Sequence, residues 1–357
     1  MRFIGNKENI LDKIYSTLIE YGIVGKTFFD FFSGTTNVAR YYKRLGYLVT
    51  SSDILYLSYC LQKAYIENNE VPLFSKLLNE IKNKVNSMAL FSTPLDFVIT
   101  YLNHIKGIDG FIFKNYTPGG SENLQIPRMY FNDYNGKKID AIRNKIEEWN
   151  KAGLLYENEY YILLACLIES VPFYANISGV YAAFQKKWDP RAKKEFILRP
   201  IEIILSDKKN KVYNIDSIKL CHDIDVDILY LDPPYNERQY APNYHLLETI
   251  AMNDNPQITG ITGMRNYDSQ KSKFCNAKSA LIELDNIAKT SKYKYLVMSY
   301  NSEGIMSQND ILETLKKYGK TIVCQFEYSR FKSNNNGLSK TKKQVYEQLY
   351  ILYSNEK

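Results

Sequence analysis

A short apolar run that ends in two prolines constrains this sequence more than any other feature. Residues 228–231 read Ile-Leu-Tyr-Leu, which suits a buried strand, and Asp232-Pro233-Pro234-Tyr235 follows directly. Proline lacks the N–H that a central strand donates, and two in succession fix an extended turn. Ligands bind at the carboxyl ends of strands in open α/β sheets. We therefore expect this turn to present a carboxylate, a backbone carbonyl and an aromatic ring to one site.

These groups match what methylation of the 6-amino group of adenine requires. That nitrogen is a poor nucleophile because its lone pair is delocalised into the ring. Hydrogen-bond acceptors for both amino hydrogens, here Asp232 and the carbonyl of Pro233, favour a pyramidal nitrogen whose lone pair can attack. Tyr235 offers a stacking face for a base taken out of its helix. The alternative is an ordinary turn at a strand end, with Asp232 as a cap.

Strand-like and helix-like segments alternate at both ends of the chain. Residues 27–32 form a β-type run that Ser33–Thr36 interrupts, and helical spacing follows over Asn37–Leu45. A strand at Tyr47–Ser51, closed by Asp53, completes the opening βαβ unit of a doubly wound sheet. Later strands are predicted at Val212–Ile215, Ile228–Leu231, Tyr295–Ser299, Thr321–Phe326 and Val345–Tyr353.

The middle of the chain has a helical pattern instead. Long helical stretches cover Leu73–Met88, Lys137–Ala152 and Tyr160–Ala175. We therefore predict an α/β fold in which residues 1–56 and 211–357 form a Rossmann-like doubly wound catalytic domain. Residues 57–210 are predicted to form a large, mostly helical insertion.

The Asp-Pro-Pro-Tyr turn resembles that of the amino-methyltransferases, and specifically the Dam-like (alpha-group) adenine DNA methyltransferases of bacterial restriction–modification systems. In that family the Asp binds the target amine and the Tyr stacks on the flipped base. The resemblance assigns these roles to Asp232 and Tyr235, with Pro233 and Pro234 completing the catalytic turn. Cytosine amino-methyltransferases usually have Ser at the first position, so Asp232 favours adenine. Cytosine-ring enzymes need a Pro-Cys pair, which the sequence lacks.

The resemblance also implies an S-adenosylmethionine-dependent sheet and a cofactor site. Residues 29–37 resemble the family's methionine-pocket motif, although the family more often has a second Gly where Thr36 stands. Asp53 is placed to accept ribose hydroxyls, and no phosphate-binding GxGxxG loop occurs. Asp216 matches an acid that approaches the cofactor adenine, although an exposed turn is an equal reading. The predicted cofactor residues are Gly5, Asn6, Lys7, Asp30, Phe32, Ser33, Gly34, Thr35, Thr36, Asn37, Asp53, Ile54 and Asp216.

The order of segments resembles the Dam-like group, whose target-recognition domain lies in this insertion. Double-stranded DNA is therefore the expected partner, and the net charge of +7 suits an anionic one. Candidate DNA contacts are Lys186 and Lys187, where solvated lysines are an equal reading, Arg238 and Tyr240 after the turn, and Arg330 and Lys332 near the last strand. A restriction endonuclease acting separately is compatible with this reading, and we expect a monomer on DNA.

Composition limits the location of the protein and the kinds of site that it can have. The chain has no apolar run of about 18 residues and opens on polar residues, so we expect no membrane contact and a cytoplasmic protein. Its five scattered cysteines predict reduced thiols, without a metal site or disulfides. Two functions compete with DNA methylation: methylation of adenine in ribosomal RNA, and binding of nucleic acid by an inactive homologue.

Overall fold

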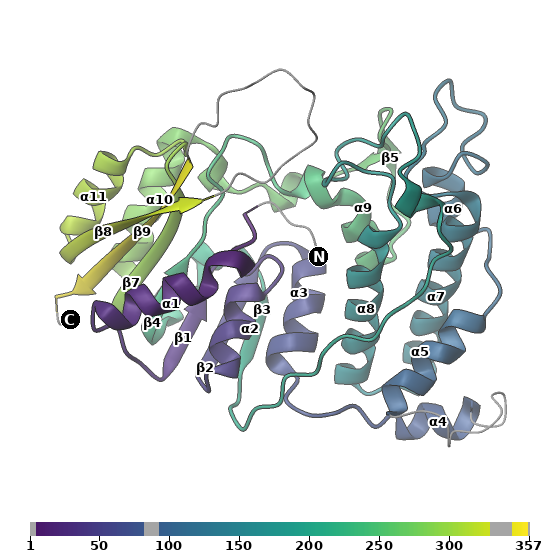
Figure 1. Ribbon diagram of the computed structural model, residues 1–357, viewed down its shortest axis with the longest axis horizontal. Coiled ribbons are helices and arrows are strands. Elements are labelled where there is room, and N and C mark those ends of the chain that lie inside the picture. Colours follow the sequence, from purple (N-terminus) through teal and green to yellow (C-terminus); the bar gives the residue numbers. More distant parts are fainter. Residues whose placement is uncertain (1–4, 82–92, 329–344, 356–357) are drawn as a thin grey trace. The chain divides into compact units, whose positions relative to one another are not determined.

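The computed structural model describes residues 5–81, 93–328 and 345–355. These residues form two compact units (Figure 1). The sheet unit contains the described residues up to Gln62, then Ser206–Ala241 and the described residues from Asp268 onward. The helical unit contains Lys63–Leu205 and Pro242–Tyr267.

All seven predicted strands are present and form one sheet. They are β1 (Thr27–Asp30), β2 (Leu48–Asp53), β3 (Lys211–Asn214), β4 (Asp225–Leu231), β7 (Lys292–Asn301), β8 (Gly319–Tyr328) and β9 (Val345–Ser354), in the order β3-β2-β1-β4-β7-β9-β8. The first five strands of this order pair in parallel, and β9 is antiparallel to both β7 and β8. The strand order reverses between β1 and β4, which is where open α/β sheets bind ligands.

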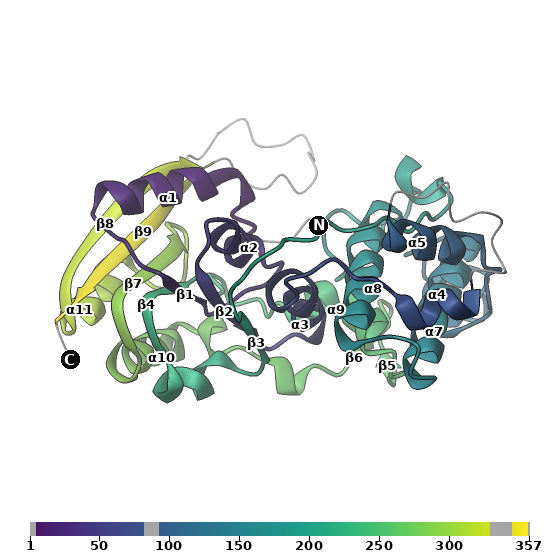
Figure 2. The same ribbon diagram turned by 90° about the horizontal axis from the view of Figure 1, so that it is seen from below.

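Helices cover both faces of the sheet (Figure 2). The helix α1 (Leu11–Glu20), preceded by the turn η1 (Glu8–Ile10), and α2 (Asn37–Arg44) lie on one face, where the Phe28 and Tyr42 rings stack 3.7 Å apart. α10 (Ala277–Thr290) and α11 (Gln308–Lys316) lie on the other face, where Phe29, Leu229 and Leu296 belong to the core. The unit also contains α3 (Tyr56–Gln62), η7 (Ser217–Asp223), η8 (Asp268–Gln270) and η9 (Lys273–Cys275).

Six helices, together with short turns and one small hairpin, make up the described part of the helical unit. The helices are α4 (Ser75–Ile81), α5 (Pro94–His104), α6 (Phe111–Tyr116), α7 (Asp133–Lys151), α8 (Glu157–Ser170) and most of α9 (Ala241–Met252). The remaining elements are η2 (Lys63–Glu67), η5 (Val171–Phe173), η6 (Pro190–Lys193) and the strands β5 (Ile258–Thr259) and β6 (Met264–Arg265). In the described part of the chain, no helix combines the length and apolarity that a membrane span requires.

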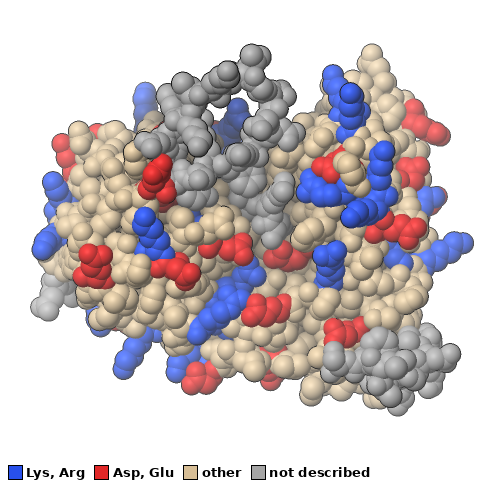
Figure 3. Space-filling view, viewed as in Figure 1, with Lys and Arg blue, Asp and Glu red and all other residues tan. Residues whose placement is uncertain are grey.

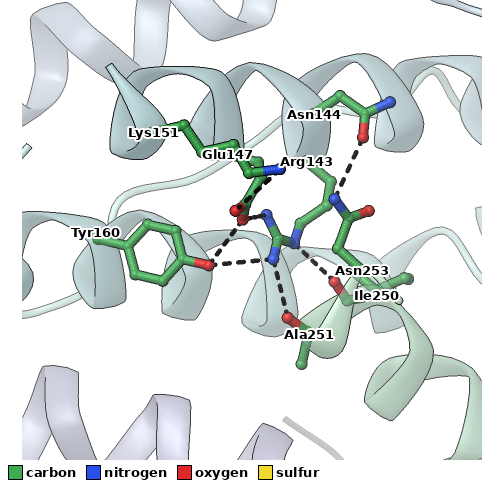
Figure 4. Close-up of polar contacts among 8 residues, drawn as sticks. All are labelled: Arg143, Asn144, Glu147, Lys151, Tyr160, Ile250, Ala251 and Asn253. Atoms are coloured by element: carbon green, nitrogen blue, oxygen red, sulfur yellow. Dashed lines mark hydrogen bonds and ion pairs between the residues drawn. The ribbon is translucent and has the colours of Figure 1, made fainter. Parts of the chain in front are cut away.

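A buried arginine holds the end of α9 in the helical unit (Figure 4). Arg143 of α7 donates from Nε to the carbonyl of Ile250 at 2.9 Å, and from Nη2 to the carbonyl of Ala251 at 3.1 Å. A cation at the last carbonyls of a helix satisfies unpaired acceptors and complements the helix dipole. These contacts explain why 242–267 packs with the helices, although the sequence analysis placed it with the catalytic domain.

Candidate active site

Four acidic residues lie at the carboxyl edge of the parallel strands. Asp30 ends β1, Asp53 ends β2, Asp216 follows β3, and Asp232 follows β4. Since these strands are consecutive neighbours in the sheet, their carboxyl ends bring the four acids to one edge. Among the described residues, no group of three or more His, Cys, Asp or Glu is arranged to hold a metal ion.

An open cavity of about 970 Å³ lies at this edge, entirely within the sheet unit. It collects most of the predicted site residues: Gly5, Asn6, Lys7, Phe32, Ser33, Gly34, Thr35, Asn37, Asp53, Ile54, Asp216, Asp232, Pro234 and Tyr240. Seven further lining residues were not predicted from the sequence: Val38, Leu55, Ser217, Gln239, Ala241, Gln270 and Ser272. Gln270 and Ser272 follow the segment that packs with the helical unit, so no motif near them pointed to this site.

The loop after β1 is fixed by Asp53. Oδ2 of Asp53 accepts the N–H of Gly34, and Oδ1 accepts the N–H of Leu55, each at 2.8 Å. Within the same loop Thr36 is buried and has φ of 65°, a left-handed backbone that glycine adopts without strain. The glycine that is usual at this position in the resembling family therefore has a conformational reason.

The segment before α1 closes against this loop. Asn37 Nδ2 donates to Oδ1 of Asn6 at 2.6 Å, which joins the segment to the start of α2. Gly5 has φ of 78°, and a Cβ there would lie 3.5 Å from the Tyr240 hydroxyl and 3.8 Å from the Tyr235 ring. The N-terminal segment thus reaches the residues that follow β4.

Asp232 is half-buried and lies beside two buried charged residues, Lys7 and Glu347. Its Oδ1 is 3.3 Å from Lys7 Nζ, which is 2.6 Å from Oε1 of Glu347. Burial raises the pKa of Asp232 to about 7, with Lys7 opposing the rise and Glu347 adding to it. Burial and the neighbouring Asp232 raise the pKa of Asp30 to about 8. Although burial opposes its charge, Asp232 and Glu347 raise the pKa of Lys7 above its usual value.

In the described part of the sheet unit, five other predicted residues lie outside the cavity lining. Asp30 is buried and accepts the N–H of Ala39 at 3.2 Å, so it faces the start of α2. Thr36 and Pro233 are buried, Tyr235 is half-buried against the core, and Arg238 is exposed. Arg330 and Lys332 lie outside the described residues.

The predicted DNA contacts of the insertion lie on the surface of the helical unit. Lys186 and Lys187 are both exposed, and so are Lys193 and Lys194 nearby in the sequence. On the face seen in Figure 3, Lys and Arg side chains gather over part of the helical unit. An exposed basic surface suits contact with phosphates, which position a nucleic acid without reading its sequence.

Comparison with known proteins identifies the family. A sequence model of the D12 class N6 adenine-specific DNA methyltransferases matches residues 3–314, which is most of the chain. This chain belongs to that family. The match includes the loop after β1, the end of β2 and the Asp232–Tyr235 turn, so the cavity lies largely within it. Glu347 lies beyond its end.

The relatives of this D12-class chain described next are named modification methylases or type II methyltransferases. The modification methylase StsI of Streptococcus sanguinis is 38% identical over 99% of this chain. The type II methyltransferase M.FokI of Planomicrobium okeanokoites is 39% identical over 94%. The chain spans about half the length of these two relatives, 52% and 50%. The type II methyltransferase M.NlaIII of Neisseria lactamica is 35% identical, and the match covers 99% of both chains.

Proposed function

We propose that the protein transfers a methyl group from S-adenosylmethionine to the 6-amino group of adenine in a specific sequence of double-stranded DNA. The observation that carries this proposal is the placement of Asp232. It lies at the carboxyl end of β4, beside the point where the strand order reverses, and it lines the cavity together with the predicted cofactor residues. The family's description names both adenine and DNA, which favours this substrate over ribosomal RNA.

The cavity suits S-adenosylmethionine by charge and by hydrogen-bonding capacity. Asp53, Asp216 and Asp232 line it, and Lys7, the one basic residue among the described lining residues, is already paired with two carboxylates. Such a lining favours a cationic ligand rich in hydroxyls and disfavours phosphate. Ser33 also lines the cavity, where its hydroxyl and backbone add hydrogen-bonding capacity.

The residues of the chain have separate tasks in this reaction. Asp53 would accept the ribose hydroxyls, and Asp216 would accept a hydrogen bond from the cofactor adenine. When bound, S-adenosylmethionine supplies a methyl group attached to a sulfonium sulfur, and the rest of the cofactor leaves as a neutral thioether. Asp232 and the Pro233 carbonyl would accept the two amino hydrogens of the target while the N–C bond forms and the C–S bond breaks. The methylated nitrogen then loses one proton to solvent.

DNA would be engaged from both units. Tyr235 would stack on a base flipped out of the duplex, with Tyr240 and Arg238 beside it, and Lys186 and Lys187 would contact phosphates. Stacking on an aromatic ring repays part of the cost of unstacking the base. We further propose that the protein acts as a monomer on DNA and that any restriction endonuclease acts as a separate protein.

A direct experiment tests substrate and product together. Purified protein is incubated with labelled S-adenosylmethionine and either plasmid DNA or ribosomal RNA, and the modified adenines are mapped by single-molecule sequencing. We expect label at adenines of one short sequence in duplex DNA. Equal or faster labelling of ribosomal RNA would reject DNA as the substrate.

A further inference from the structure

The last strand brings a buried glutamate to the catalytic edge of the sheet. β9 runs antiparallel to β7, with Tyr295 opposite Tyr353 at one end and Asn301 opposite Glu347 at the other. The start of β9 therefore lies beside the carboxyl end of β7, at the edge that carries Asp232. Glu347 is 2% exposed, so its carboxylate depends on protein partners.

One side chain, that of Lys7, connects Glu347 to Asp232. Oε1 of Glu347 accepts a hydrogen bond from Lys7 Nζ at 2.6 Å and another from Ser299 Oγ at 2.5 Å. The same Lys7 ammonium is 3.3 Å from Asp232 Oδ1, and Lys7 is 5% exposed. The ammonium thus bridges two carboxylates and lies nearer to Glu347.

Acidic groups outnumber cations around Lys7. Lys7 is one cation, whereas three acids lie around it: Glu347 and Asp30 are buried and Asp232 is half-buried, and the Tyr230 hydroxyl is buried close by. Neighbouring like charges cannot all ionise in a site of low dielectric constant. How strongly Glu347 neutralises the Lys7 ammonium therefore determines how far Lys7 lowers the pKa of Asp232.

We propose that Glu347 is a positioning residue for Asp232: it holds the Lys7 ammonium between the two carboxylates, so that Asp232 stays oriented yet basic enough to accept a hydrogen bond from the target amine. This inference rests on the proposed function, in which Asp232 binds that amine. Glu347 lies outside residues 3–314, the part of the chain that the family model matches. The role is therefore assigned by this structure and not by the family motifs.

The test compares two substitutions that act on Asp232 in opposite directions. Glu347→Gln keeps the shape and an acceptor for Lys7 but removes the negative charge, so the pKa of Asp232 should fall by about one pH unit. Lys7→Met removes the cation, so the pKa of Asp232 should rise. The readout is a carboxyl ¹³C NMR titration of cofactor-free protein with labelled aspartate, assigned with Asp232→Asn. Glu283→Gln is the matched control, because Glu283 is also buried and bound to a lysine, Lys273.

Activity adds a second readout. The midpoint of the pH–kcat profile should move to lower pH in Glu347→Gln, with kcat at high pH reduced by up to about tenfold and KM for DNA unchanged. Midpoints that stay at the wild-type value in both variants would overturn the inference, as would shifts in the same direction. If Glu347→Gln does not fold, the Lys7→Met variant tests the inference by itself. An unshifted or lowered midpoint in that variant would then overturn the inference. Full activity of Asp232→Asn would instead reject the proposed function, and the NMR titration would still report on Glu347.

Discussion

Oδ2 of Asp53 accepts the backbone N–H of Gly34 at 2.8 Å, and this bond joins the end of β2 to the loop that follows β1. The other oxygen of Asp53 accepts the N–H of Leu55. The carboxylate thus fixes the shape of the loop, and Asp53 also lines the cavity.

Substitution of Asp53 should weaken cofactor binding. Asp53→Ala removes charge-assisted hydrogen bonds and loosens the loop, so we expect S-adenosylmethionine affinity to fall by about 1.5–3 kcal/mol. DNA affinity without cofactor should change little. Isothermal titration calorimetry measures the loss, with Asp225→Ala as control because Asp225 is exposed at the far end of β4. Unchanged cofactor affinity would place the ribose elsewhere.

Substitution of Asp232 should lower the rate of the chemical step and leave binding nearly unchanged. Asp232→Ala should lower kcat by at least about two orders of magnitude, because it removes an electrostatic contact that strengthens in the transition state. Asp232→Asn keeps one acceptor oxygen without the charge and should retain residual activity. Tyr235→Ala should instead weaken retention of the flipped base by about 1–3 kcal/mol, read with a fluorescent base analogue. Near-normal turnover of Asp232→Ala would exclude this turn as the catalytic site.

The buried acids should make both rate and stability depend on pH. Because ionised Asp232 stabilises the positive charge that develops on the target amine better than the neutral acid and its pKa is about 7, the rate should rise as pH increases through about 7. The free energy of unfolding should change in the opposite direction and fall as pH rises. The folded pKa values of Asp232 and Asp30, about 7 and about 8, exceed the unfolded value near 3.9. The folded state therefore holds more protons, and its stability falls as pH rises from about 4 to 8.

Denaturant unfolding of cofactor-free protein at several pH values checks the stability half of this prediction. Asp232→Asn cannot ionise, so its unfolding free energy should depend less on pH over the same range. A wild-type stability that is flat between pH 4 and 8, or that rises, would contradict the raised pKa values.

Cofactor binding near neutral pH should release protons. S-adenosylmethionine carries a sulfonium that S-adenosylhomocysteine lacks, and a cation among buried acids favours their ionised forms. Calorimetry in buffers of different ionisation enthalpy counts the protons. We expect more protons released by S-adenosylmethionine than by S-adenosylhomocysteine, and a smaller difference in Asp232→Asn. Equal counts for the two ligands would mean that Asp232 and Asp30 do not respond to the sulfonium.

Glycine should be tolerated at Thr36. Relief of the left-handed backbone, worth about 1–2 kcal/mol, should offset the loss of the side chain in Thr36→Gly. The unfolding free energy should then stay within about 1 kcal/mol of the wild type. Thr36→Val keeps the strained backbone and loses the 2.6 Å hydrogen bond to the Thr35 carbonyl, so it should be less stable. The opposite ranking of the two variants would show that the Thr36 side chain outweighs the strain.

The sheet was predictable because each strand has a local signature. Phe28 and Phe29 in β1 and the apolar residues of β4 are β-forming, and the prolines after β4 mark where it ends. Asp53 and Asp232 could be assigned to the site because a parallel sheet brings successive strand ends to one edge. Their placement around one cavity agrees with that reasoning.

Other features depend on pairings that no local pattern encodes. Glu347 lies in a segment correctly predicted as a strand, but only the antiparallel pairing of β9 with β7 brings it to the carboxyl edge. Similarly, the local sequence of residues 242–252 predicts a helix but does not indicate to which domain that helix belongs. Their assignment to the helical unit depends on contacts with a distant helix, such as those made by Arg143.

Lys7 and Glu347 are 340 positions apart in sequence and share one hydrogen bond in the charge group around Asp232. During translation the second of them is made 340 residues after the first. An unfinished chain can therefore fold much of the loop around Asp53 but cannot complete the ion pair. The contact of Lys7 with Glu347 therefore forms only after β9 has been made and has paired with β7.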